Sequence, residues 1–291
     1  MLNLAKFYDY LKATRSKATA DAYLKGVRKL VKYMASRDIT IAAVPKNLLF
    51  GFVQSMVTEG LSPKTIQLML AGSRRFMRWL RENGIPIPEL VQPDVPRAPR
   101  RQPEVVTTDL LERYTRSSKT EGEPYRTIFL LLPLLGARID EMCSLKIDSI
   151  GRGDGGFALL FHGKGNKERR IPLSTLAQEV LGAYLRGNPG WELGTWLFPD
   201  PKHPDRHVTQ GQVRNRMRTI RKEIGALWLT PHKMRHTCAT FLRKAGVPID
   251  VIRQILGHES IKTTLGYVAS CSLDSDMRDA VERITDLWRD S

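Results

Sequence analysis

The stretch TPHKMRHTCAT, which runs from Thr230 to Thr240, places two histidines, a lysine and an arginine in little more than one helical turn. We expect a helix from Pro231 to Lys244. His232 and His236 have the spacing of the two histidines in HExxH zinc proteases, but that motif needs a glutamate after the first histidine. Lys233 stands there instead, and cations beside a dication raise the electrostatic cost of binding it. The pattern therefore predicts no metal site.

An anion suits the same residues better. His232 and Arg235 would project from one face of the helix near its N-terminus, where free N–H groups and the helix dipole favour negative charge. A guanidinium group can also donate to two phosphoryl oxygens at once. The segment therefore predicts a phosphate-binding site. Taken alone, it is equally compatible with His236 packed in a core and Arg235 paired with an acid.

Three further motifs accompany this segment. LGARIDEMCSLK has Arg138 at an expected helix start, followed by Glu141; GKGNK places Lys164 in a tight turn; and LGHESIKTTLGYV contains His258 and, nine residues later, Tyr267. The order of these motifs resembles the signature of the tyrosine recombinase family, which includes the phage integrases and the Xer-type recombinases. That signature is G-x-R-x-x-E, a lysine in a β-turn, H-x-x-R-H, L-G-H and T-T-x-x-Y.

The resemblance implies a role for each motif residue, and the chemistry agrees. A phosphodiester carries one negative charge, and attack by an oxygen nucleophile builds a state with about two. Arg138 and Arg235 would stabilise the added charge, and Tyr267 would be the nucleophile that forms a phosphotyrosyl ester. Lys164 would be the general acid that reaches the leaving oxygen, and His232 would assist proton transfer. His258 would hydrogen-bond the scissile phosphate, and Glu141 would orient a neighbouring cation. No metal and no other cofactor is expected, because guanidinium groups supply the charge and the ester stores the bond energy.

The elements that precede these motifs are predicted to be helical. Between Lys6 and about Arg81, apolar residues recur every three to four positions. Ser62 and Pro63 predict a helix start, and Gly60 closes the helix before it. The polar side of the helix that begins at Pro63 consists of Lys64, Gln67, Arg74 and Arg78. This side would either lie along a DNA groove or simply be solvated.

A proline-rich segment follows this helical half. Six prolines between Pro86 and Pro103 predict an extended linker, because proline removes a backbone donor and disfavours helix in the preceding residue. We therefore expect a helical core-site DNA-binding domain over residues 1–95, a linker over 96–103 and a catalytic domain over 104–291. The cations of the linker would run along phosphates, and they are Arg97, Arg100 and Arg101.

The second half predicts mixed structure. Two strands are expected, Phe157–His162 and Arg169–Leu173. The apolar run from Ile128 to Ala137 is about half the roughly 20 residues that cross a bilayer, so it predicts a core helix. Helical patterns cover Thr107–Ser118, Pro124–Leu145, Ser174–Arg186, Thr209–Ile224, Pro231–Lys244, Pro248–Leu256 and Leu273–Trp288. The fold class is therefore mainly α with a small antiparallel β-sheet.

The composition favours a polyanionic partner. Lys plus Arg total 46 and Asp plus Glu total 30, a formal net charge of +16 with a pI near 10.0, and the excess is spread along the chain. Nucleic acid is the common partner of such a protein, although charge that serves only solubility would look similar. Three scattered cysteines fit a reducing cytoplasm, and the N-terminus lacks the continuous apolar segment of a secretory signal. We therefore expect a cytoplasmic protein with no membrane contact, and the resemblance to recombinases implies that it is nucleoid-associated.

The resemblance implies a C-shaped clamp on double-stranded DNA with a specific core site, and a homo-tetramer on two synapsed sites. Strands would be cut to a 3′-phosphotyrosine and exchanged through a Holliday junction. A C-terminal helix would dock into a neighbouring protomer or pack on its own domain through Met277, Val281, Ile284 and Trp288. We expect a simple core-site enzyme without the extra N-terminal domain that binds arm-type sites in lambda integrase. The alternatives are a type IB topoisomerase and a catalytically silent DNA-binding protein.

Overall fold

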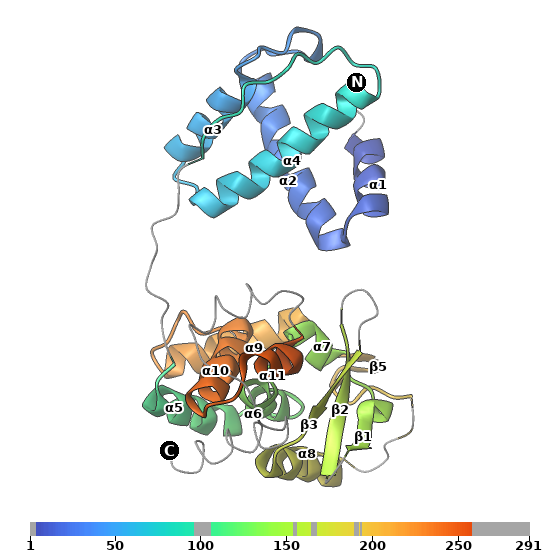
Figure 1. The fold of residues 1–291 in the computed structure, drawn as a ribbon, viewed down its shortest axis with the longest axis vertical. Helices are drawn as coiled ribbons and strands as arrows, with labels where there is room; N and C mark the ends of the chain where they lie inside the picture. Colours follow the sequence, from blue (N-terminus) through green and yellow to red (C-terminus); the bar gives the residue numbers. More distant parts are fainter. Residues whose placement is uncertain are drawn as a thin grey trace. The chain divides into compact units, whose positions relative to one another are not determined.

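The computed structural model describes residues 4–95, 106–153, 156–163, 168–188, 192 and 194–257. The chain divides into two compact units, Met1–Gln102 and Pro103–Ser291 (Figure 1). Several predictions fall outside the described residues, namely those for the linker 96–103 with its three arginines, for the helix over 273–288, and for Lys164, His258 and Tyr267.

The described part of the first unit contains four α-helices and a 3-10 turn, Ile41–Ala43. The α-helices are α1 (Leu4–Thr14), α2 (Lys17–Ala35), α3 (Leu48–Thr58) and α4 (Pro63–Glu82). Helices α2 and α4 pack backbone against backbone, because both present glycine where they cross (Figure 1). A Cβ atom on Gly26 would lie 2.5 Å from the Met69 carbonyl oxygen, and one on Gly72 would lie 2.6 Å from that of Tyr23.

The start of α4 confirms the sequence prediction. Ser62 is the N-cap and accepts a hydrogen bond from the Thr65 backbone N–H, and Pro63 is the first helical residue. One residue of the predicted polar side of α4, Arg74, is not fully available to a ligand. Arg74 is half-buried and its Nη2 donates to the Pro93 carbonyl at 3.4 Å, so this arginine holds the chain's own irregular segment after α4. The other three residues, Lys64, Gln67 and Arg78, are exposed.

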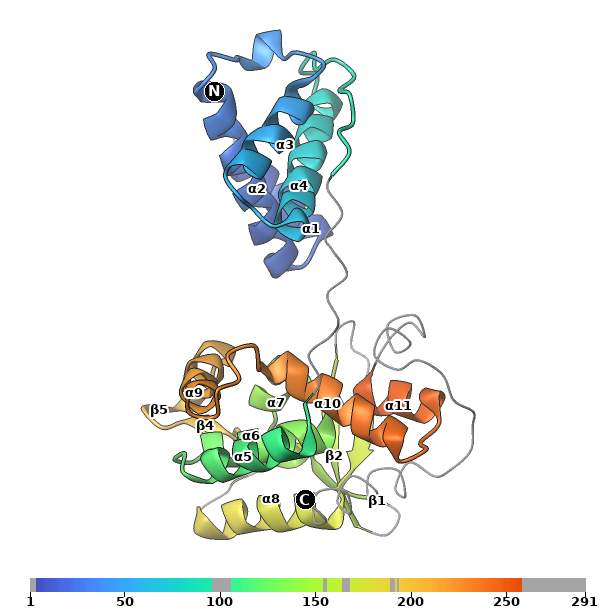
Figure 2. The same cartoon turned by 90° about the vertical axis from the view of Figure 1, so that its left-hand side faces the viewer.

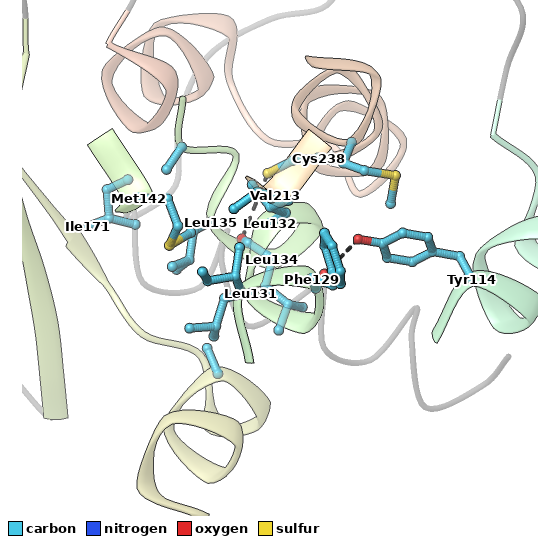
Figure 3. Packing of buried hydrophobic residues seen from close by; sticks show 14 of the residues in the cluster. Tyr114, Phe129, Leu131, Leu132, Leu134, Leu135, Met142, Ile171, Val213 and Cys238 are labelled. Atoms are coloured by element: carbon cyan, nitrogen blue, oxygen red, sulfur yellow. Dashed lines mark hydrogen bonds between the residues drawn. The ribbon is translucent and has the colours of Figure 1, made fainter. Parts of the chain in front are cut away.

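The second unit is built around α6 (Tyr125–Leu135), most of whose residues are buried. Around it pack α5 (Thr108–Lys119), α8 (Thr175–Gly187) and α10 (Pro231–Lys244) (Figure 2). Figure 3 shows Leu131, Leu132, Leu134 and Leu135 of α6 inside this core. The Tyr114 hydroxyl donates to the Phe129 carbonyl at 2.9 Å. The prediction of a core helix in this apolar run is confirmed, and no helix among the described residues has the length and apolar character to cross a bilayer.

The predicted helical stretch Pro124–Leu145 is broken in two. Helix α6 ends at Leu135, Gly136 adopts a left-handed conformation with φ of +56°, and α7 (Ile139–Cys143) begins with Arg138 as its N-cap. A Cβ atom on Gly136 would lie 2.7 Å from Leu256 Cδ2 and 2.9 Å from Cys238 Sγ. Glycine therefore ends the first helix and leaves Arg138 at the start of the next.

A three-stranded antiparallel sheet, in the order β1-β2-β3, completes this unit (Figure 1). Strands β2 (Gly156–His162) and β3 (Glu168–Pro172) confirm the two predicted strands, and their register pairs Leu160 with Arg170. Three short strands were not predicted, because they lack apolar alternation: β1 (Ile150–Gly153), β4 (Pro199–Asp200) and β5 (His203–His207). The remaining helices among the described residues are α9 (Gln210–Glu223), α11 (Ile249–Leu256) and the 3-10 turn Ile147–Ser149. The predicted fold class, mainly α with small antiparallel sheets, is confirmed.

Candidate active site

Arg138 is held at the start of α7 by its own helix and by a distant backbone group. Its Nη1 donates to Glu141 Oε1 at 2.8 Å, and its backbone N–H donates to Glu141 Oε2 at 2.8 Å. Its Nη2 donates to the Gly257 carbonyl at 3.0 Å. The side chain is 40% exposed, so the guanidinium group is both anchored and open to a ligand.

Glu141 is a buried carboxylate between two arginines. Its side chain is 4% exposed, and Arg169 donates to it twice, from Nη1 to Oε1 at 2.9 Å and from Nη2 to Oε2 at 2.6 Å. Burial raises the pKa of the carboxyl group, but the hydrogen bonds and charge of Arg169, together with the two hydrogen bonds from Arg138, outweigh it and bring the pKa to about 2. Glu141 is therefore ionised at neutral pH, and two arginines against one glutamate leave one net positive charge.

Arg235 is the second candidate arginine and comes from α10. It is 2% exposed, its Nη1 donates to the Gly136 carbonyl at 2.8 Å, and its Nη2 donates to the Leu256 carbonyl. His232 lies one turn earlier and is exposed, with its ring 4.8 Å from that of His236 in an edge-to-face arrangement. Thr230 is the N-cap of α10 and accepts a hydrogen bond from the Lys233 N–H.

The three described catalytic candidates line one cleft. Arg138, His232 and Arg235 face a cavity of about 800 Å³ formed by α7, α9 and the start of α10. Helix α9 adds three arginines on one side, and Asp140 is the one acidic side chain among the described residues of the lining. The α9 arginines are Arg214, Arg218 and Arg221. The cleft is therefore strongly positive, which suits a polyanion.

Sequence reasoning missed two parts of this site. The spacing of the α9 arginines places them on one helical face, a signal that was present in QVRNRMRTIRKE. Arg169 shares the inward face of β3 with Ile171, whereas Arg170 points outward, and strand alternation could have indicated this. The cleft is lined by residues of the second unit, whereas the first unit contains the predicted DNA-contact residues Lys64, Gln67, Arg74 and Arg78.

The chain matches known families over most of its length. Residues 104–272 match the phage integrase family, and residues 4–84 match the phage integrase N-terminal SAM-like domain. The chain belongs to the phage integrase family. This integrase-family protein is thereby a tyrosine site-specific recombinase, as the order of its motifs predicted.

Relatives of this recombinase extend the match across both units. It is 29% identical over 282 residues to tyrosine recombinase XerC of Mycobacterium tuberculosis, covering 91% of this chain and 92% of that protein. It is 30% identical over 265 residues to tyrosine recombinase XerD of Listeria innocua, covering 86% of each.

Solved structures share the fold of the recombinase. XerH bound to difH substrate gives a TM-score of 0.69 at 21% identity, covering 85% of this chain and 76% of that one. A lambda integrase dimer bound to a COC′ core site gives a TM-score of 0.72 at 15% identity, covering 94% of this chain and 78% of that one.

Proposed function

We propose that this recombinase cuts and rejoins double-stranded DNA at a specific core site through a covalent ester of Tyr267. Each cut would leave a 3′-phosphotyrosine and a free 5′-hydroxyl, and strand exchange would pass through a Holliday junction. The observation that carries this proposal is the convergence of Arg138, His232 and Arg235 on one positive cleft. The DNA complexes of XerH and lambda integrase, which share the fold, support it.

The cleft can stabilise the charge that develops on the scissile phosphate. Contacts with described residues use two of the five N–H donors of Arg138, so its exposed guanidinium can also reach phosphate oxygens. Arg235 contributes a second positive charge from the buried wall. Both are held in place before the substrate arrives, and loss of one such preorganised contact typically costs about 10² to 10³ in rate.

The proposed step balances as a transesterification. The Tyr267 oxygen bonds to phosphorus and loses its proton with the help of His232, while the bond from phosphorus to the 5′-oxygen breaks and Lys164 protonates that oxygen. His258 would hydrogen-bond the phosphate, and Glu141 would orient Arg138. Religation is the reverse attack by a 5′-hydroxyl, so the proposed reaction consumes no nucleotide and uses no metal cofactor.

The proposed recombination reaction implies duplex DNA and further copies of this chain as partners. Duplex DNA would contact the α9 arginines, the exposed side of α4 and the linker cations Arg97, Arg100 and Arg101. Two synapsed sites would carry a homo-tetramer, with the C-terminal helix exchanged between protomers. Such a protein would work in the cytoplasm, on nucleoid DNA.

The first test is Tyr267→Phe on nicked DNA, where a cleaved strand cannot be resealed and the protein stays attached. The target is found by mapping where the parent protein becomes covalently trapped on nicked DNA from its host. We expect the parent to form a covalent complex and the variant to bind the same DNA without forming one. Cleavage by Tyr267→Phe, or a block by chelators, would overturn the mechanism. Efficient relaxation of supercoiled DNA that lacks the site would instead indicate a topoisomerase.

A further inference from the structure

Three successive backbone carbonyls at the end of α11 each accept a hydrogen bond from a different arginine. Arg169 Nε donates to Ile255 at 3.0 Å, Arg235 Nη2 donates to Leu256, and Arg138 Nη2 donates to Gly257 at 3.0 Å. The arginines come from β3, α10 and the N-cap of α7. The last carbonyls of a helix have no partner within the helix, and they lie at the negative end of its dipole. This end of α11 is therefore a cation-binding point where three elements meet.

Arg169 differs from the other two arginines because it is absent from the lining of the cleft. Its side chain is 12% exposed and is held on several sides. It makes the bidentate contact with Glu141, its Cζ lies 5.0 Å from the Phe161 ring centroid, and a Cβ atom on Gly257 would lie 3.0 Å from its Cδ and Nη1. Arg169 thus contacts both structures that hold Arg138, the Glu141 carboxylate and the Gly257 turn.

We propose that Arg169 is a positioning residue for strand cleavage, which fixes the direction and the effective charge of Arg138 through Glu141. This proposal rests on the proposed function, and it adds Arg169 to the residues that support strand cleavage. Glu141 accepts four hydrogen bonds, two from Arg138 and two from Arg169. Without Arg169, two acceptor positions of a buried carboxylate lose their partners, and the carboxylate reorients together with Arg138.

Charge gives a second reason for the same role. Arg138, Arg169 and Glu141 together carry one net positive charge, and removal of Arg169 leaves a neutral pair. Arg138 would then have less field to offer a phosphate that gains negative charge. A misplacement of about 1 Å can cost about 10²-fold in rate. DNA affinity is shared among the many cations of a chain with a net charge of +16, so both effects should act mainly on cleavage.

The test compares Arg169→Met, Arg169→Lys and the matched control Arg170→Met. Arg170 is the next residue of β3 and is exposed, with its Nη1 donating to the Arg152 carbonyl at 3.3 Å. The single-turnover rate of covalent complex formation is measured on nicked core-site DNA at saturating protein, together with the Kd for that DNA. We expect cleavage about 10²-fold slower for Arg169→Met and about 10-fold slower for Arg169→Lys, which keeps the charge and loses the planar fork. Kd should stay at the parental value, and Arg170→Met should match the parent in both.

A double-mutant cycle with Glu141→Gln separates positioning from general stability. In the Arg169→Met background, Glu141→Gln should cost much less than it does alone, because the two residues act through one network. The proposal is overturned if Arg169→Met cleaves at the parental rate, if its cleavage and DNA binding fall in parallel, or if the two losses add. Should Arg169→Met not fold, a parental rate for Arg169→Lys has the same meaning. A parent that forms no covalent complex would refute the proposed function itself, whatever the Arg169 variants do.

Discussion

Glu141 carries more of the candidate site than its spacing in the sequence indicated. Its position one turn after Arg138 predicted contact with a cation, and the structure places it against two, with all four hydrogen bonds supplied by arginines. The second arginine, Arg169, belongs to a strand that lies far away in the sequence. The buried carboxylate therefore joins a helix start to a sheet, in addition to its contact with Arg138.

This carboxylate should contribute to stability in a pH-dependent way. Its pKa is about 2 in the folded chain against an ordinary 4.5, a depression equivalent to about 3 kcal/mol. Because the folded pKa is the lower one, the contribution is fully present above about pH 4.5 and is lost as the pH falls towards 2. We expect Glu141→Gln to be less stable than the parent at neutral pH, with a difference that shrinks across this window. Urea unfolding at a series of pH values measures it, and a difference independent of pH would contradict the assignment.

At the scale of elements, glycines decide where helices end and how closely they approach. The sequence pattern ran through Gly136 as one helix, since the apolar period continues on both sides of it. The break occurs where Gly136 takes a left-handed φ of +56°, and side chains of α10 and α11 fill the space where a Cβ would stand. The apolar period alone did not locate the end of α6, whereas the start of α4 at Ser62 and Pro63 was predictable because the cap and the proline act locally.

The crossing of α2 and α4 gives a direct test at this scale. A Cβ atom at position 72 would lie 2.6 Å from the Tyr23 carbonyl oxygen, and its three nearest atoms all belong to the Tyr23 backbone, which cannot rotate away as a side chain can. We expect Gly72→Ala to destabilise the first unit by about 1 to 3 kcal/mol, despite the better helix propensity of alanine. Gln67→Ala, at an exposed position of the same helix, is the control. Thermal unfolding of the full chain measures both, and equal stability of the two variants would show that the helices can separate at little cost.

For the whole molecule, the net charge of +16 predicted a polyanionic partner, and the structure shows where part of it gathers. The α9 arginines, Arg138 and Arg235 surround one cleft of the second unit. The rest of the charge is spread over both units. We therefore expect DNA affinity to fall steeply with salt, since each phosphate neutralised by a cation releases counterions.

A single arginine of α9 should change that dependence by a countable amount. Log K for DNA falls as log salt rises, and Arg218→Met is expected to make this negative slope less steep by about 1. Arg216→Met is the matched control on the same helix, because Arg216 lies outside the cleft lining, 3.7 Å from Glu121 and against the Tyr125 ring. Titrations of DNA at several salt concentrations give both slopes. An unchanged slope for Arg218→Met would show that this face of α9 does not touch phosphates.

The amino-acid sequence alone determined the family, the reaction class and most helices of this protein. Those properties depend on residue type and local spacing: caps, apolar periods, and the ordered arginine, histidine and tyrosine motifs. Only the tertiary structure decided how the cations are held. Arg169 and Arg138 bind carbonyls 86 and 119 residues away, and any residue type carries a backbone carbonyl, so nothing in the sequence marks these acceptors.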